Sequence, residues 1–228
     1  MAKQEKGINM SIKSRIYNIL PGVKIIGMHH MCDAPDELCD CVISKANFER
    51  FISGKSFVTL EEAITHPASN NGSYCITIDD GLADLYDIYL LTKEKNIPIA
   101  AFVSSSLVGQ PGYISEKQLK TMTNDPLVTI GSHGRTHIKL TECDDAKVRN
   151  EMCLSREELF AIVGTRTKFF AYPNGAFSAR EEKMLKNAGY TYAMSVIPRK
   201  NTIVTKMMMP YAIPRYNLTN ETFKEEVD

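Results

Sequence analysis

Short apolar runs alternate along the chain with longer segments in which apolar residues recur every three or four positions. A short apolar run bounded by polar residues indicates a buried strand, and the 3.6-residue period indicates an amphipathic helix. Alternation of the two favours an α/β fold, in which helices join the strands of a parallel sheet. The strands predicted in this way cover residues 23–28, 74–78, 99–103, 127–130, 168–171 and 192–196.

The clearest helical pattern covers residues 82–96, where Leu82, Leu85 and Tyr89 share one face and Pro98 follows the end. The charged run 147–156 also has helical spacing, and its mixture of basic and acidic residues predicts a solvated helix face.

Other helix ends are predicted from capping signals. A hydroxyl residue three positions before an acidic or amide residue is typical of a capping box, and Gly164 and Gly189 suit C-terminal ends. The predicted boxes are Ser115 with Gln118, Thr141 with Asp144, and Ser178 with Glu181. The chain has no internal repeat or flexible linker, so one domain is predicted over residues 1–228, with a core at about 20–220.

Composition excludes several classes of protein. Hydrophobic residues make up 43% and charged residues 24% of the 228 residues, as in an ordinary globular protein. No stretch approaches the roughly 20 apolar residues of a transmembrane helix. With 27 basic and 27 acidic residues the net charge is zero, so no overall field attracts nucleic acid.

Six cysteines without a CxxC pair indicate reduced thiols rather than a disulfide scaffold. The irregular spacing of Cys32, Cys39 and Cys41 favours ordinary loop thiols over a zinc site. The first 22 residues lack the apolar run of a secretory signal. A cytoplasmic protein is therefore expected, and a removed leader stays open as the alternative.

Polar residues follow four predicted strands directly. Asp79 and Asp80 come after 74–78, and a Tyr-Pro-Asn-Gly segment comes after 168–171. The loop after 127–130 contains His133 and His137, and the strand 23–28 runs into His29 and His30. Because the carboxyl ends of parallel strands open on one face, we expect these side chains to lie close together.

Two imidazoles and a carboxylate can hold a divalent cation and leave positions open for water and substrate. His133 and His137 with Asp79 or Asp80 make such a set, and the remaining carboxylate is then available as a general base. Taken singly, Asp-Asp-Gly indicates a turn, and His-x3-His occurs on exposed helix faces. Their joint position at strand ends favours metal-assisted hydrolysis.

These segments resemble the motifs of one known family. Residues 75–81, CITIDDG, resemble the Thr-Phe-Asp-Asp-Gly motif of the NodB-homology polysaccharide deacetylases, and residues 131–137 resemble its Gly-Ser-His-x-x-x-His motif. Residues 170–175 are similar to the third motif, and residues 213–215 to the arginine-containing closing strand of one branch. The resemblance covers about residues 24–217 and implies an irregular (β/α) barrel of about seven parallel strands.

The resemblance implies a role for each motif residue. Asp79 would be the general base, and Asp80, His133 and His137 would bind a divalent metal, usually Zn²⁺, with Co²⁺ or Ni²⁺ as alternatives. In a branch similar to the poly-N-acetylglucosamine deacetylases the catalytic acid is an N-terminal histidine. His29 would then be the acid, with His30 as the runner-up.

The third motif implies contacts to substrate or oxyanion from Tyr172, Pro173 and Asn174, with Arg215 also assigned to this group. The chain has no tryptophan, and Ala171 stands where the majority pattern has an arginine. Arg215 is therefore expected to supply the positive charge that orients the base.

The implied activity is removal of acetyl groups from N-acetylated sugars of a polysaccharide or glycan precursor. Two alternatives stay open. The same residues can attack an O-acetyl ester or a cyclic amide, and a catalytically silent carbohydrate-binding domain can retain the fold.

Overall fold

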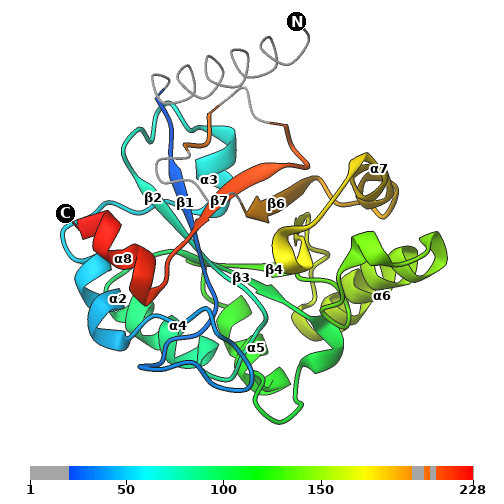
Figure 1. The fold of residues 1–228 in the computed structure, drawn as a ribbon, viewed down its shortest axis with the longest axis horizontal. Helices are drawn as coiled ribbons and strands as arrows, with labels where there is room; N and C mark the ends of the chain where they lie inside the picture. Colours follow the sequence, from blue (N-terminus) through cyan, green and yellow to red (C-terminus); the bar gives the residue numbers. More distant parts are fainter. Residues whose placement is uncertain (1–20, 197–202, 206–208, 228) are drawn as a thin grey trace, which may run out of the picture.

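The computed structural model describes residues 21–196, 203–205 and 209–227. Within these ranges seven parallel strands pair in sequence order, and β7 returns to β1 to close a barrel (Figure 1). The predicted seven-stranded barrel is confirmed. The strands are β1 (Lys24–Met28), β2 (Tyr74–Ile78), β3 (Ile99–Val103), β4 (Val128–Ser132), β5 (Phe169–Ala171), β6 (Tyr192–Val196) and β7 (Ile213–Asn217).

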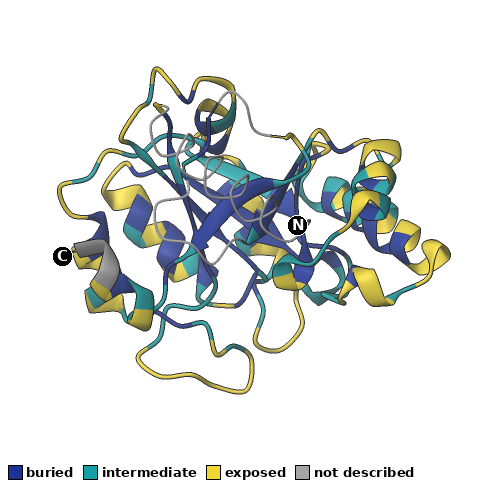
Figure 2. Cartoon of the chain, turned by 45° about the horizontal axis from the view of Figure 1, so that its top comes forward, coloured by how far each residue is buried: buried dark blue, intermediate teal, exposed yellow. Residues whose placement is uncertain are grey.

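Helices surround the barrel and present their outer faces to solvent, while the strands are buried (Figure 2). The described helices are α2 (Lys45–Ile52), α3 (Leu60–Thr65), α4 (Leu85–Glu94), α5 (Glu116–Thr123), α6 (Asp145–Val163), α7 (Ala179–Asn187) and α8 (Asn220–Val227), with short 3-10 turns η1 (Ser105–Leu107), η2 (Leu140–Glu142) and η3 (Pro173–Gly175). In the described part of the chain, none of them combines the length and apolar character that crossing a membrane requires.

The barrel is irregular because its strands pair to different extents. Five residue pairs join β3 to β4, but the single pair Ser132 with Phe170 joins β4 to β5. Strand β4 extends two residues beyond the predicted end at Ile130, because Gly131 and Ser132 continue the pairing with β3. A Cβ at position 131 would lie 2.4 Å from the Phe102 ring, so glycine is needed for this close approach.

Two of the three predicted capping boxes are confirmed, at Ser115 and at Ser178. The box predicted at Thr141 is wrong. Thr141 lies in η2, and the side chain of Asp144 caps α6 by accepting a hydrogen bond from the N–H of Lys147 at 2.8 Å. An aspartate is itself a strong N-cap residue, so it displaces the weaker signal upstream.

The predicted solvated face of residues 147–156 is present at Lys147, Arg149 and Asn150, which are exposed, but the opposite face of the helix is not solvated. Val148, Glu151, Met152 and Ser155 are buried and face the barrel. A buried glutamate and serine look like solvent-facing residues in sequence, because their burial depends on partners elsewhere in the chain.

Candidate active site

The end of β2 places two aspartates in different environments. The N–H of Asp79 continues the pairing with β1 by donating to the carbonyl of Met28 at 2.9 Å, and the Asp79 side chain points into the barrel. The backbone then turns sharply, with left-handed φ values of 70° at Asp80 and 82° at Gly81. A Cβ at Gly81 would lie 2.9 Å from Val103. This turn directs Asp80 into the pocket while Asp79 stays beneath it.

Three ligand atoms converge above Asp79. Oδ1 of Asp80 lies 3.3 Å from Nε2 of His133 and 3.1 Å from Nε2 of His137. One atom from each residue lies within 4.8 Å of the other two. Nδ1 of His133 lies 2.9 Å from the carbonyl of Ala171, so it is the protonated nitrogen and Nε2 keeps its lone pair for the pocket.

These residues fit a divalent cation. Oδ1 of Asp80 is buried and has no hydrogen-bond partner among the described residues, although two imidazole nitrogens point toward it. A buried carboxylate oxygen without a donor is costly, and a cation shared with the two imidazoles removes that cost. Two imidazoles and one carboxylate also leave coordination positions open.

Asp79 forms a buried ion pair with Arg215, which reaches it from β7. Both terminal nitrogens of the guanidinium lie 2.6 Å from the carboxylate oxygens, and each side chain is about 1% exposed. Burial raises the pKa of Asp79, but the charge and hydrogen bonds of Arg215, together with the nearby His133 and His29, outweigh burial and hold that pKa below its usual range. Arg215 thus lies beneath the carboxylate and supplies its countercharge. The substrate contact that the resemblance implies for Arg215 is separate from this ion pair and stays a prediction.

The two adjacent histidines point in different directions. Nε2 of His29 lies 4.0 Å from Oδ2 of Asp79, and the ring lines the pocket. Burial lowers the pKa of His29. The ring of His30 lies instead between two other carboxylates. Its Nδ1 is 3.0 Å from Oδ2 of Asp84, and its Nε2 is 3.1 Å from Oδ2 of Asp36. Of the two candidates for the acid, the structure places His29 in the pocket.

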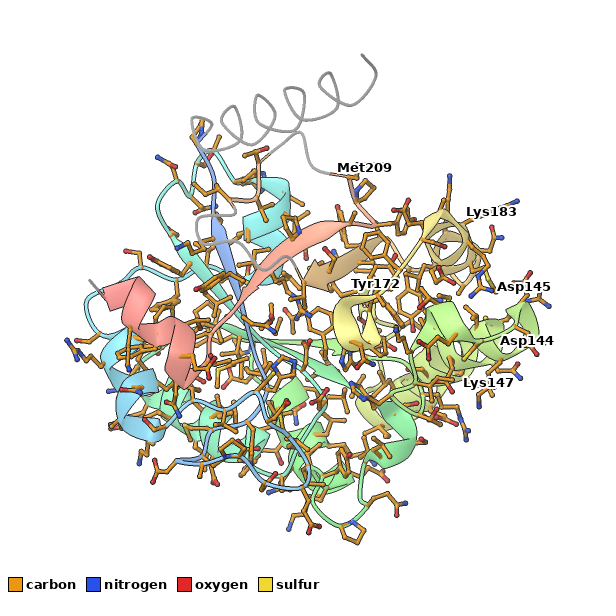
Figure 3. The ribbon with its side chains drawn as sticks, in the orientation of Figure 1. Asp144, Asp145, Lys147, Tyr172, Lys183 and Met209 are labelled. Atoms are coloured by element: carbon orange, nitrogen blue, oxygen red, sulfur yellow. The ribbon has the colours of Figure 1, made fainter. Side chains whose placement is uncertain are left out.

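The third-motif segment, residues 170–175, contributes another wall of the pocket. Tyr172 is buried, with its hydroxyl donating to the carbonyl of Tyr211 at 3.0 Å, and Figure 3 shows it inside the molecule beside η3. The N–H groups of Tyr172 and Gly175 are used within the protein, and Pro173 has none. Asn174 has a left-handed φ of 59° and lines the pocket.

The pocket has a volume of about 320 Å³. Sequence analysis assigned no role in the pocket to six of its wall residues, two of them cysteines that it interpreted as ordinary loop thiols: Leu38, Cys39, Asp40, Cys41, Asn217 and Val196. The first four lie in the loop after β1, and Asn217 is the last residue of β7. Their places at carboxyl ends of strands were the available signal, but no motif marked them.

Comparisons with known proteins agree with this geometry. A family model described as polysaccharide deacetylase matches residues 67–193, which is more than half of the chain. The chain is 25% identical over 212 residues to a poly-beta-1,6-N-acetyl-D-glucosamine N-deacetylase from Staphylococcus aureus, and the match covers 82% of this chain and 71% of that protein.

Solved structures share the fold. IcaB from Ammonifex degensii superimposes with a TM-score of 0.76 at 20% identity, covering 90% of this chain and 95% of that one. A polysaccharide deacetylase from Bacillus cereus gives a TM-score of 0.76 at 20% identity, covering 90% and 69%. These identities support the fold alone, whereas the family model spans Asp79, Asp80, His133 and His137 of the pocket. The chain belongs to the polysaccharide deacetylase family.

Proposed function

We propose that this protein is a metal-dependent hydrolase that removes acetyl groups from N-acetylated sugars of a polysaccharide or glycan precursor. The observation that carries the proposal is the convergence of Asp80, His133 and His137 in one pocket, directly above the buried Asp79–Arg215 pair. The name of the Staphylococcus aureus relative makes poly-β-1,6-N-acetylglucosamine the first polymer to assay.

Asp80, His133 and His137 would hold the metal, and Zn²⁺ is the first candidate because it accepts mixed imidazole and carboxylate ligands, with Co²⁺ or Ni²⁺ as alternatives. When bound, such a cation polarises a carbonyl oxygen and lowers the pKa of a water.

Asp79 acts as the general base in this proposal. Its low pKa keeps it ionised, and Arg215 fixes its plane through both oxygens. Each carboxylate oxygen has a second lone pair, so the ion pair leaves Asp79 able to accept a proton from an attacking water.

His29 and Asn174 complete the reaction. The N–H of Asn174 donates to the oxyanion that forms on the acetyl carbon. The lowered pKa of His29 makes its ring neutral at rest, so it needs a proton before it can protonate the leaving amine. Asp79 holds that proton after the attack, and Nε2 of His29 is 4.0 Å from it. A small movement of the His29 ring toward Asp79 lets the proton taken from water pass from Asp79 to His29 and then to the leaving amine.

The test combines metal content with acetate release. Elemental analysis should give about one divalent metal ion per chain in the parent and none in a His133→Ala, His137→Ala variant. Acetate release should be measured on N-acetylglucosamine oligomers and on O-acetylated sugars. If acetate is released only from O-acetylated sugars, the substrate is an ester rather than an amide. If the protein has neither bound metal nor turnover, a catalytically silent carbohydrate-binding domain is favoured.

His29→Ala tests the acid. It should retain the metal and lose about 10²- to 10⁴-fold in kcat. If His29→Ala stays active and His30→Ala does not, the role belongs to His30.

A further inference from the structure

The loop between the two histidines has an unusual set of hydrogen-bond partners. Gly134 and His137 have left-handed φ values of 75° and 59°, so the loop cannot pair as a strand or a helix. Its carbonyl groups are satisfied mainly from the loop after β3. Ser104 Oγ donates to His133 O at 3.1 Å, the Ser105 N–H to Gly134 O at 3.2 Å, and the Ser106 N–H to Arg135 O at 3.0 Å.

Two successive N–H groups of the same loop are satisfied by one buried carboxylate from α6. The backbone N–H groups of Arg135 and Thr136 both donate to Oε2 of Glu151, each at 2.8 Å. The hydroxyl of Thr136 donates to Oε1 at 2.7 Å. Successive N–H groups aimed at one anion form an anion-binding nest, and here the anion belongs to the protein. Glu151 is 1% exposed, so these bonds are shielded from water.

Two neighbours on the same face of α6 extend this grip. Ser155, one helical turn after Glu151, donates to the carbonyl of Gly134 at 2.9 Å. Glu158 accepts from Nε of Arg135 at 2.7 Å and from the Ser105 hydroxyl at 2.6 Å. Positions i, i+4 and i+7 share a helix face, so one face of α6 holds the whole turn. Asp144, which caps α6, lies with Asp145 and Lys147 at the outer edge of the helix (Figure 3).

We propose that Glu151 is a positioning residue, the internal hydrogen-bond acceptor that holds residues 133–137 in the conformation that presents both imidazoles to one cation. The link to metal binding rests on the proposed function; the grip on the loop stands on the contacts above. A carboxylate suits this place because it accepts from three donors at once, and burial strengthens each bond. The nearest cation, Nζ of Lys147 at 3.6 Å, is half-exposed, so the loop N–H groups are the main partners of the charge.

Three substitutions of Glu151 separate the effect of its side-chain length from the effect of its negative charge. Glu151→Gln keeps the reach, because its carbonyl can accept both N–H groups and its amide can donate to the Thr136 hydroxyl. Glu151→Asp keeps the charge but is one methylene too short. Glu151→Ala loses both. Glu157→Ala is the matched control, since Glu157 is an exposed residue of α6 paired with Arg166.

The first measurement is Zn²⁺ affinity by competition with a chromophoric chelator. We expect affinity to fall about 10- to 100-fold in the Ala and Asp variants and less than about threefold in the Gln variant and the control. An unchanged affinity in Glu151→Asp would overturn the proposal, as would an equal loss in Glu151→Gln, which would assign the effect to charge. If Glu151→Ala fails to fold, the Asp and Gln variants decide.

The second measurement is hydrogen exchange of the Arg135 and Thr136 amides in metal-free protein. Exchange should accelerate about tenfold or more in Glu151→Asp and stay near the parent rate in Glu151→Gln and in Glu157→Ala. Exchange is independent of metal. A parent that binds no Zn²⁺ would therefore remove the metal from the proposed function, while accelerated exchange would still support the grip of Glu151. Unchanged exchange in Glu151→Asp would overturn it.

Discussion

Two loops line the same pocket, and they are held in different ways. The loop at 133–137 is fixed by buried side chains, with Glu151 and Ser155 at 1% and 0% exposure. The loop after β1 is fixed largely by Asp36, which is 46% exposed in its side chain and accepts from the N–H groups of Leu38 and Cys39. At the base of this loop, His30 lies between Asp36 and Asp84 and contacts both carboxylates. The loop at 133–137 is thus held by buried partners, whereas the loop after β1 depends on partly exposed, titratable contacts.

The largest expected effect lies beneath both loops, at the buried ion pair. Arg215→Met leaves the Asp79 carboxylate buried without its countercharge, which should lower the free energy of unfolding by about 3–5 kcal/mol. Chemical denaturation measures it. Lys93→Met is the control, because Lys93 is half-exposed beside Asp125, so solvent screens its charge and the loss should be much smaller. Equal losses in the two variants would show that burial of the pair contributes nothing.

The next effect breaks the buried side of the comparison. Ser155→Ala removes the hydroxyl that serves Gly134 and Ser132, and we expect a loss of about 1–3 kcal/mol in the free energy of unfolding. Thr121→Ala, at an exposed hydroxyl that bonds only within α5, should change it by less than about 0.5 kcal/mol. A loss in Ser155→Ala no larger than in Thr121→Ala would contradict the buried grip.

A smaller effect is expected on the exposed side. His30→Ala removes the link between Asp84 and Asp36, and because that link is partly solvated its cost should be about 1 kcal/mol or less. Hydrogen exchange should accelerate at Leu38 and Cys39, whereas the amides of Arg135 and Thr136 keep the parent rate. His66→Ala, at an exposed residue that ends α3, is the control. Acceleration in both loops would show that they are coupled rather than separately held.

The smallest effect is a pH dependence of the loop after β1. Burial lowers the pKa of His30, but the carboxylates of Asp84 and Asp36 outweigh it and raise that pKa. A raised pKa means that protonated His30 stabilises the loop fully below its ordinary value of about 6.5, and that this stability is lost as the pH rises through the raised value. Exchange at Leu38 and Cys39, corrected for the intrinsic rate, should accelerate over that range. His30→Ala should abolish the dependence; persistence there would assign it to another group.

Sequence analysis predicted the fold well because its signals were local. The strands 74–78, 99–103 and 192–196 were found with the predicted bounds, since each is an apolar run bounded by polar residues. The errors arose where two local signals competed or where a partner was distant. Asp144 rather than Thr141 caps α6, and the polar residues Glu151 and Ser155 of α6 are buried although their sequence resembles a solvated segment.

The sequence by itself placed two aspartates and four of the histidines at the carboxyl ends of parallel strands, because all parallel strands end on the same side, and the resemblance to the family implied that these strands form a barrel. Only the tertiary structure decided which of His29 and His30 faces the pocket, and it gave the geometry in which Arg215, expected from the sequence to orient the base, reaches Asp79 from a strand 136 residues away. It also showed Glu151 buried against the loop between the histidines. Spacing along a chain records direction and period, whereas burial and countercharge depend on which distant residues fold against a position.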